Sequence, residues 1–130
     1  MIPDVSELTF VSHPDEVIAR DDDFIARAPV GIADRQALFS ALAKELEFPA
    51  YFGWNWNALD ELLRDFSWIP SKRIVLVHDE LPVQMGEDNL KVYLAILIDS
   101  VKDWKPGEEH ELVVVFPTAY REQIQQILHD

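Results

Sequence analysis

The side chains best suited to chemistry form a short run, His78-Asp79-Glu80, directly after an apolar segment. A histidine beside two carboxylates could act as a general base or contribute to a metal site. No second histidine stands at a ligand spacing from His78, and Pro82 follows the run closely. A polar strand end before a proline is the ordinary explanation of this pattern, and we favour it over a catalytic or metal site.

Three consecutive carboxylates, Asp21-Asp22-Asp23, raise the question of a calcium site. An EF-hand loop needs ligands spread along a longer segment with a late glutamate, and that pattern is missing. A solvated turn is therefore expected here. The sequence has no cysteine, which excludes a disulfide framework and a thiol nucleophile. We expect no catalytic residue, metal or cofactor, and an enzyme is the least favoured class because no nucleophile–base pair or phosphate loop is present.

The most distinctive segment, residues 48–70, is rich in aromatic side chains but lacks the strict alternation of a strand. Pro49 and Gly53 predict a turn, and Asn55 can cap a helix because its side-chain oxygen accepts an orphan backbone N–H. Helical spacing then continues to Phe66. The apolar stripe of this predicted helix is formed by Leu59, Leu62, Leu63 and Phe66. Its polar face consists of Asn57, Asp60, Glu61, Arg64 and Asp65.

This segment resembles the pattern Tyr-Tyr/Phe-Gly-x-Asn-Trp/Leu-Asp-Ala-Leu of the barstar family, the intracellular protein inhibitors of secreted ribonucleases. In this chain the pattern reads Tyr51-Phe52-Gly53-Trp54-Asn55-Trp56-Asn57-Ala58-Leu59. Aromatic, glycine and asparagine positions joined to an amphipathic helix make a specific motif. The resemblance implies a ribonuclease inhibitor, an immunity protein or antitoxin. Its aromatic loop and acidic helix would fill the basic active site of a cognate ribonuclease toxin.

The resemblance also assigns roles to single positions. Tyr51 matches an aromatic contact position, Gly53 would let the backbone approach a partner closely, and Asn55 matches the capping asparagine. Glu61 stands where the dominant aspartate of the family lies. The predicted partner-binding residues are Tyr51, Gly53, Trp54, Asn55, Trp56, Asn57, Asp60, Glu61 and Arg64. Core packing is an equal alternative for the aromatic residues Trp54, Trp56 and Phe66, and a purely capping role is the stronger alternative for Asn55.

Two positions depart from the family pattern. Asn57 replaces a common aspartate, and Arg64 replaces a neutral polar residue. A cation at residue 64 would face a basic pocket unless Asp60 or Glu61 neutralises it. Both departures support a second hypothesis, a non-inhibitory interaction domain of the same fold that binds another basic protein. The alternatives for one further acidic contact are Asp99 and Asp103.

The composition is consistent with a protein that binds a basic partner. The chain of 130 residues has a formal net charge of −13 at pH 7 and is 48% hydrophobic, which suits one globular domain, residues 1–130. The charge disfavours nucleic acid or an anionic membrane as a direct ligand and favours a basic protein, although acidic surfaces also simply keep proteins soluble. No signal-peptide pattern or transmembrane-length segment is present, so we expect the cytoplasm.

Periodicity predicts strands alternating with helices along the chain. The expected strands are residues 24–30, 73–77 and 112–116, with a weaker candidate at 8–11. The expected helices are residues 34–47, 56–66, one from Gly86-Glu87-Asp88 to about 102, and a last one capped by Thr118, with a single helical turn at 14–19. This order predicts an α/β fold with a parallel sheet of about three strands. The resemblance covers the core, Phe24 to Phe116, and leaves an N-terminal addition and an extra C-terminal helix.

Overall fold

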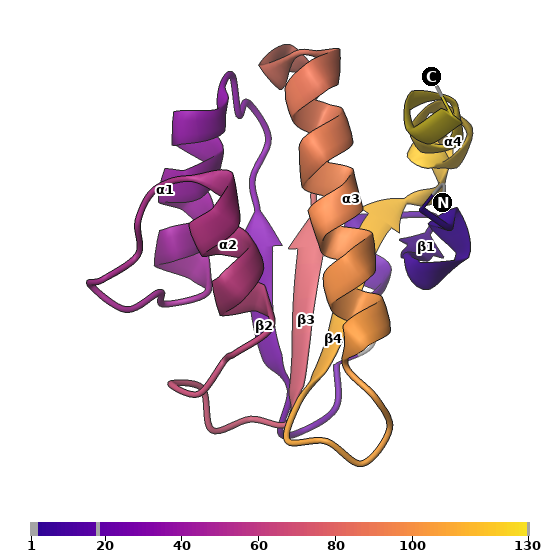
Figure 1. Ribbon diagram of the computed structural model, residues 1–130. Coiled ribbons are helices and arrows are strands. Elements are labelled where there is room, and N and C mark those ends of the chain that lie inside the picture. Colours follow the sequence, from indigo (N-terminus) through magenta and orange to yellow (C-terminus); the bar gives the residue numbers. More distant parts are fainter. Residues whose placement is uncertain (1–2, 18, 130) are drawn as a thin grey trace.

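One parallel sheet organises the computed structural model, which describes residues 3–17 and 19–129 (Figure 1). Within this part of the chain the sheet has four strands in the order β1-β4-β3-β2. Their bounds are β1 (Thr9–Val11), β2 (Phe24–Ala28), β3 (Arg73–His78) and β4 (Glu111–Pro117). The three strands with the clearest sequence signal are confirmed. The weaker candidate at residues 8–11 is confirmed as well, and it extends the expected sheet of about three strands beyond β4.

The helices of the described residues lie mainly on one face of the sheet. They are α1 (Arg35–Glu45), α2 (Trp56–Leu63), α3 (Glu87–Asp103) and α4 (Arg121–His129). Figure 1 shows α1, α2 and α3 side by side in front of the strands, while α4 packs against α3 at the side where β1 lies. The predicted α/β class, the parallel sheet and the C-terminal helix are confirmed. No helix within the described ranges is long and apolar enough to cross a membrane.

The start of α1 is as predicted, whereas its end and the start of α4 differ from the prediction. Asp34 caps α1 as predicted, because its Oδ1 accepts the N–H of Ala37 at 2.8 Å. The predicted end of α1 was two residues too late, since Glu47 has a φ of 54° and cannot continue a right-handed helix. The prediction that Thr118 caps the last helix was wrong. Thr118 begins a 3-10 turn without a side-chain cap, and α4 starts at Arg121.

The alternation of side chains along the strands divides the core between the two faces of the sheet. The face under the helices carries Ile74, Leu76 and Phe116, which are fully buried in the main core. The opposite face carries a smaller cluster around Val75, Val77 and Val115. Each buried valine stabilises the fold by about 1.5–3 kcal/mol relative to an exposed one.

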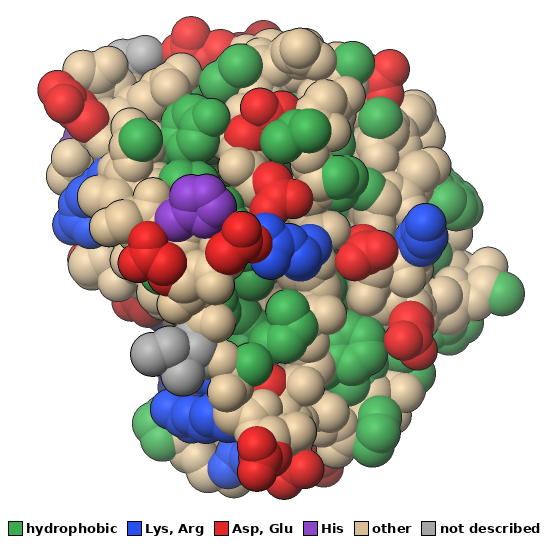
Figure 2. Space-filling view, turned by 180° about the vertical axis from the view of Figure 1, so that it is seen from behind, with side chains coloured by type: hydrophobic (Ala, Val, Ile, Leu, Met, Phe, Trp, Pro, Cys, Tyr) green, Lys and Arg blue, Asp and Glu red, His purple; other side chains and the backbone are tan. Residues whose placement is uncertain are grey.

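The segment between β1 and β2 covers this smaller cluster from behind. It includes the 3-10 turn Pro14–Glu16, which contacts β4, and Val17, which packs against the valines. This turn falls within the helical turn predicted at residues 14–19. Figure 2 shows the molecule from this side, with acidic and basic side chains interspersed among hydrophobic ones and a histidine next to acidic side chains. The sheet is therefore protected on both faces, although by helices on one side only.

Candidate functional site

The aromatic loop between α1 and α2 is anchored by its buried member, Phe52. This ring is only 5% exposed and packs edge-on against Phe39 of α1 and Phe48, with ring centroids 5.9 and 4.9 Å apart. The N–H of Phe52 also donates to the carbonyl of Pro49 at 3.0 Å, which forms the predicted turn. The middle of the loop is consequently anchored to the core, which restricts the movement of the residues on either side of Phe52.

Two aromatic side chains of this loop face solvent. Tyr51 is 71% exposed and Trp54 is 47% exposed. Trp54 has a φ of 56°, a left-handed conformation that costs free energy in a residue other than glycine. The centroid of its ring lies 5.1 Å from that of Phe52, so the indole packs against the buried ring of the loop while nearly half of the residue faces solvent. Exposed aromatic rings on a supported loop are typical of protein-binding surfaces.

Asn55 joins the loop to α2, as the sequence predicts for a capping residue. Its Oδ1 accepts the N–H of Ala58 at 2.8 Å, and its Nδ2 donates to the carbonyl of Gly53 at 3.1 Å. A Cβ on Gly53 would lie 3.3 Å from Nδ2 of Asn55 and 3.4 Å from Cβ of Ala58. The missing side chain of Gly53 therefore has an internal role, since it allows this loop to pack closely against the start of α2.

The three aromatic residues left open between core and surface have different environments. Trp54 is exposed, as described above. Trp56 is partly buried and packs edge-on against Phe39, with centroids 5.0 Å apart, and near Tyr93 of α3 at 6.4 Å. Phe66 is fully buried and stacks near Trp104 at 6.3 Å, so it belongs to the core. Trp56 thus couples the loop to the interior more than it extends the surface.

The helix α2 is shorter than predicted, and its polar face is short as a result. It ends at Leu63, and Phe66, the predicted end, has a φ of 51° that turns its ring back into the core. Asn57 and Glu61 are both exposed, one helical turn apart, and they share the outward face as predicted. The predicted polar face of α2 is therefore present and includes the exposed carboxylate of Glu61.

Arg64 is clamped by carboxylates from two helices. Its Nε donates to Oδ1 of Asp60 at 3.1 Å, and its Nη1 forms an ion pair with Asp103 of α3. This arrangement confirms the expected Asp60–Arg64 pair and identifies Asp103 as an acidic residue beside α2. Asp99 is exposed one helical turn earlier on α3. Two carboxylates around one guanidinium leave a local charge of −1. The surface stays acidic even though it contains an arginine.

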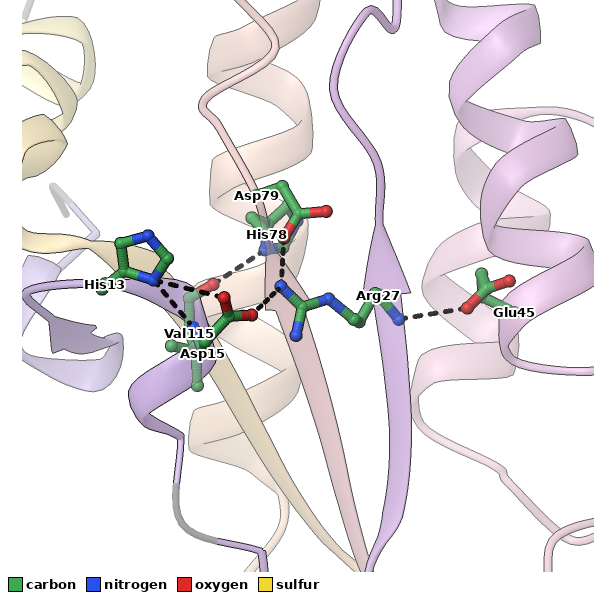
Figure 3. Close-up of polar contacts among 7 residues, drawn as sticks. All are labelled: His13, Asp15, Arg27, Glu45, His78, Asp79 and Val115. Carbon is green, nitrogen blue, oxygen red and sulfur yellow. Dashed lines mark hydrogen bonds and ion pairs between the residues drawn. The ribbon is translucent and has the colours of Figure 1, made fainter.

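The run His78-Asp79-Glu80 does not converge on one site, because each side chain has its own partner. Figure 3 shows Asp79 next to Arg27, whose Nη2 lies 2.5 Å from Asp79 Oδ1 and 3.3 Å from Asp15 Oδ1. The hydrogen bond to Asp79 raises the pKa of Arg27 above its ordinary value. Glu80 instead accepts the backbone N–H of residue 31 at 2.7 Å. Among the described residues, no group of three or more His, Cys, Asp or Glu side chains is placed to hold a metal ion.

His78 is the last residue of β3, as the predicted polar strand end requires, but its side chain is fully buried. Its Nδ1 lies 3.1 Å from the carbonyl oxygen of Val115, and its Nε2 lies 2.6 Å from the hydroxyl of Tyr93. Because a carbonyl can only accept, Nδ1–H donates to Val115 and the Tyr93 hydroxyl donates to Nε2. Burial lowers the pKa of His78 to about 4 and raises the pKa of Tyr93. This pair is a neutral core hydrogen bond.

The three aspartates near β2 form a turn, but not an entirely solvated one. Asp21 and Asp22 are exposed as expected. The side chain of Asp23 is only 3% exposed; it accepts the backbone N–H of Arg20 at 2.9 Å and forms an ion pair with Arg73 of β3. Asp23 therefore ties the start of β2 to its neighbouring strand. Sequence reasoning missed this role because Arg73, although close in space, is 50 residues away from Asp23 in the sequence.

The family is established by comparison with known proteins. The family model described as Barstar (barnase inhibitor) matches residues 28–126. The chain belongs to the barstar family. The matched part contains the aromatic loop, α2 and α3, and it continues beyond Phe116 into α4. A search of curated proteins found no match. The description of the family names an inhibitor of the ribonuclease barnase.

Proposed function

We propose that this barstar-family chain inhibits a ribonuclease by covering its active site with the aromatic loop and α2. The observation that carries the proposal is the exposure of Tyr51 and Trp54 in the loop that leads into α2, together with the exposed carboxylate of Glu61 on that helix. Aromatic anchors next to charged groups are the usual determinants of affinity in protein interfaces. Within this interface we assign contacts to Asn57 as well, because it lies one turn from Glu61 on the same face.

The chemistry of the target supports this assignment. In a ribonuclease, cationic side chains of the active site stabilise the negative charge that develops on the phosphate during cleavage. Carboxylates on a fixed helix can occupy those cationic positions and exclude the substrate. The net charge of −13 adds long-range attraction to a basic enzyme, which accelerates encounter.

We further propose that the ribonuclease is a toxin and that the chain is its cytoplasmic immunity protein. An inhibitor protects the producing cell only where the active enzyme and its RNA substrate can meet, and this favours the cytoplasm. The proposal includes no catalytic residue, no cofactor and no direct contact with nucleic acid.

A second candidate is an interaction domain that binds a basic protein without inhibiting it. Arg64 and Asn57 favour this function, because each reduces the negative charge of the face relative to the family pattern. The pairing of Arg64 with Asp60 and Asp103 weakens the argument, since that part of the face still has a net negative charge.

The experiment that separates the two is capture of partners from the native host with this chain as bait, followed by an RNA-cleavage assay. Under the inhibitor proposal, a basic ribonuclease is captured and a stoichiometric amount of the chain abolishes its activity. A captured partner that keeps full ribonuclease activity, or a captured basic protein without such activity, would support the second candidate.

Point variants then test the face itself. Glu61→Arg should weaken inhibition strongly while the fold persists, because the side chain is exposed. Glu122→Arg is the matched control: it makes the same charge change at an exposed residue of α4, away from the proposed interface. Equal effects of the two variants would mean that only net charge matters and would remove Glu61 from the interface.

A further inference from the structure

Arg64 is the feature of the proposed interface that the inhibitor function does not explain. Its side chain is 32% exposed, so part of the guanidinium reaches the surface beside α2. A cation here is unexpected on a face meant for a cationic active site. The contacts of Arg64 show whether its side chain could turn away from a cationic partner.

The surrounding groups hold Arg64 in place. A guanidinium has five N–H donors in a rigid plane, and two of its nitrogens are already committed to Asp60 and Asp103. The contact with Asp60 is a charge-assisted hydrogen bond and the contact with Asp103 is an ion pair, and the two carboxylates come from different helices, α2 and α3. Arg64 cannot turn away without breaking both contacts. It therefore stays where it is, and it keeps the carboxylates of Asp60 and Asp103 engaged within the protein.

We propose that Arg64 is a specificity residue: by offsetting Asp60 and Asp103 it lowers the affinity for ribonucleases with a lysine or arginine opposite it, relative to one with a neutral or acidic group there. This inference rests on the inhibitor function proposed above. Juxtaposed like charges at an interface are a common means of rejecting a wrong partner, because they cost several kcal/mol when they are desolvated. The clamp adds to the effect because Arg64 occupies Asp60 and Asp103, which could otherwise pair with cations of the enzyme.

The chain provides a closely matched control for this idea. Arg27 of β2 is also held between two carboxylates, Asp15 and Asp79, and its side chain is 41% exposed. It lies on the sheet face opposite the helices, because its neighbours Ala26 and Ala28 point into the main core. Neutralising either arginine changes the net charge equally and frees two carboxylates. Only Arg64 belongs to the proposed interface.

The test measures the affinity of the chain for barnase, the ribonuclease named in the family description. We expect Arg64→Gln to bind at least about tenfold more tightly than the unmodified chain, which corresponds to about 1.4 kcal/mol. Arg27→Gln should change the affinity less than about twofold. Arg64→Lys keeps the charge and should show no gain. Asp103→Asn keeps the cation and loses a carboxylate, so it should bind more weakly than the unmodified chain.

Several results would overturn the proposal. Equal gains in Arg64→Gln and Arg27→Gln would show an effect of net charge alone, and a gain in Arg64→Lys would show that charge is not the reason. Failure of Arg64→Gln to gain any affinity would show that Arg64 is not what limits binding. If Arg64→Gln does not fold, tighter binding by Asp103→Asn would contradict the proposal. Failure of the inhibitor function is distinguishable, because it is measured on proteins captured from the host and not on barnase.

Discussion

The buried His78–Tyr93 pair predicts that the stability of the fold decreases in mild acid. His78 is neutral in the folded chain, with Nδ1–H donating to Val115 and Nε2 accepting from Tyr93. Protonation would add a second N–H to the ring, at Nε2, and the Tyr93 hydroxyl would then have to accept instead of donate within the core. A charged imidazole would also lose its hydration in the core, and the nearby carboxylate of Asp79, which is already paired with Arg27, offsets only part of that cost.

The magnitude follows from the two pKa values. Burial lowers the pKa of His78 from 6.5 in the unfolded chain to about 4 in the folded one. Between these values the unfolded state binds more protons, so stability is complete above the unfolded value and falls as pH decreases toward 4. Each pKa unit corresponds to about 1.4 kcal/mol, so the loss is about 2 kcal/mol at pH 5 and about 3 kcal/mol when the transition is complete.

The assay is urea unfolding of the unmodified chain and of His78→Gln at several pH values between 7.5 and 4.5. Acidic residues that titrate near the lower limit contribute equally to both proteins, so the difference between the two curves isolates His78. We expect His78→Gln to be less stable at pH 7.5 but nearly independent of pH through this range. His13→Gln changes an exposed histidine and should keep the pH dependence of the unmodified chain. Parallel curves for the unmodified chain and His78→Gln would refute the reasoning.

Three further predictions concern the loop, the core and the kinetics of binding. Asn55→Ala should lower the free energy of unfolding by about 1 kcal/mol because it removes the cap of α2, whereas Asn57→Ala should change it by less than about 0.5 kcal/mol, both measured by urea unfolding. Phe66→Ala should lower the free energy of unfolding by about 3–5 kcal/mol because its ring is fully buried; a cost below 1 kcal/mol would contradict its place in the core. Raising the salt concentration should slow association with the captured ribonuclease more than it accelerates dissociation, and stopped-flow rates that do not depend on salt would contradict electrostatic steering.

Periodicity was sufficient to predict the elements whose signals are local. The strands around Ile74 and Val114 are short apolar runs, and the caps Asp34 and Asn55 act within three residues of their own positions. The loop-and-helix motif was also readable, because its aromatic, glycine and asparagine positions are contiguous. These features depend on neighbours along the chain, and the structure confirms them.

Features that depend on distant residues could not be predicted in this way. No spacing in the sequence connects Arg64 with Asp103, or His78 with Tyr93. The early end of α2 also has a tertiary cause, since Phe66 leaves the helix to reach the core near Trp104. Spacing alone placed Phe66 on the helix, and only the packing of the folded chain could correct it.

The pairing of β1 with β4 has a consequence for how the chain acquires its structure. Thr9 lies opposite Val115, so the first strand must wait for the last strand of the described sheet before it gains a partner. During synthesis β2 and β3 can pair much earlier, while β1 stays unpaired until β4 has left the ribosome. Until then, and in any variant that lacks the first dozen residues, the outer edge of β4 offers unpaired backbone groups to other chains. By pairing with β4 late in folding, β1 thus covers this edge and protects the chain from aggregation.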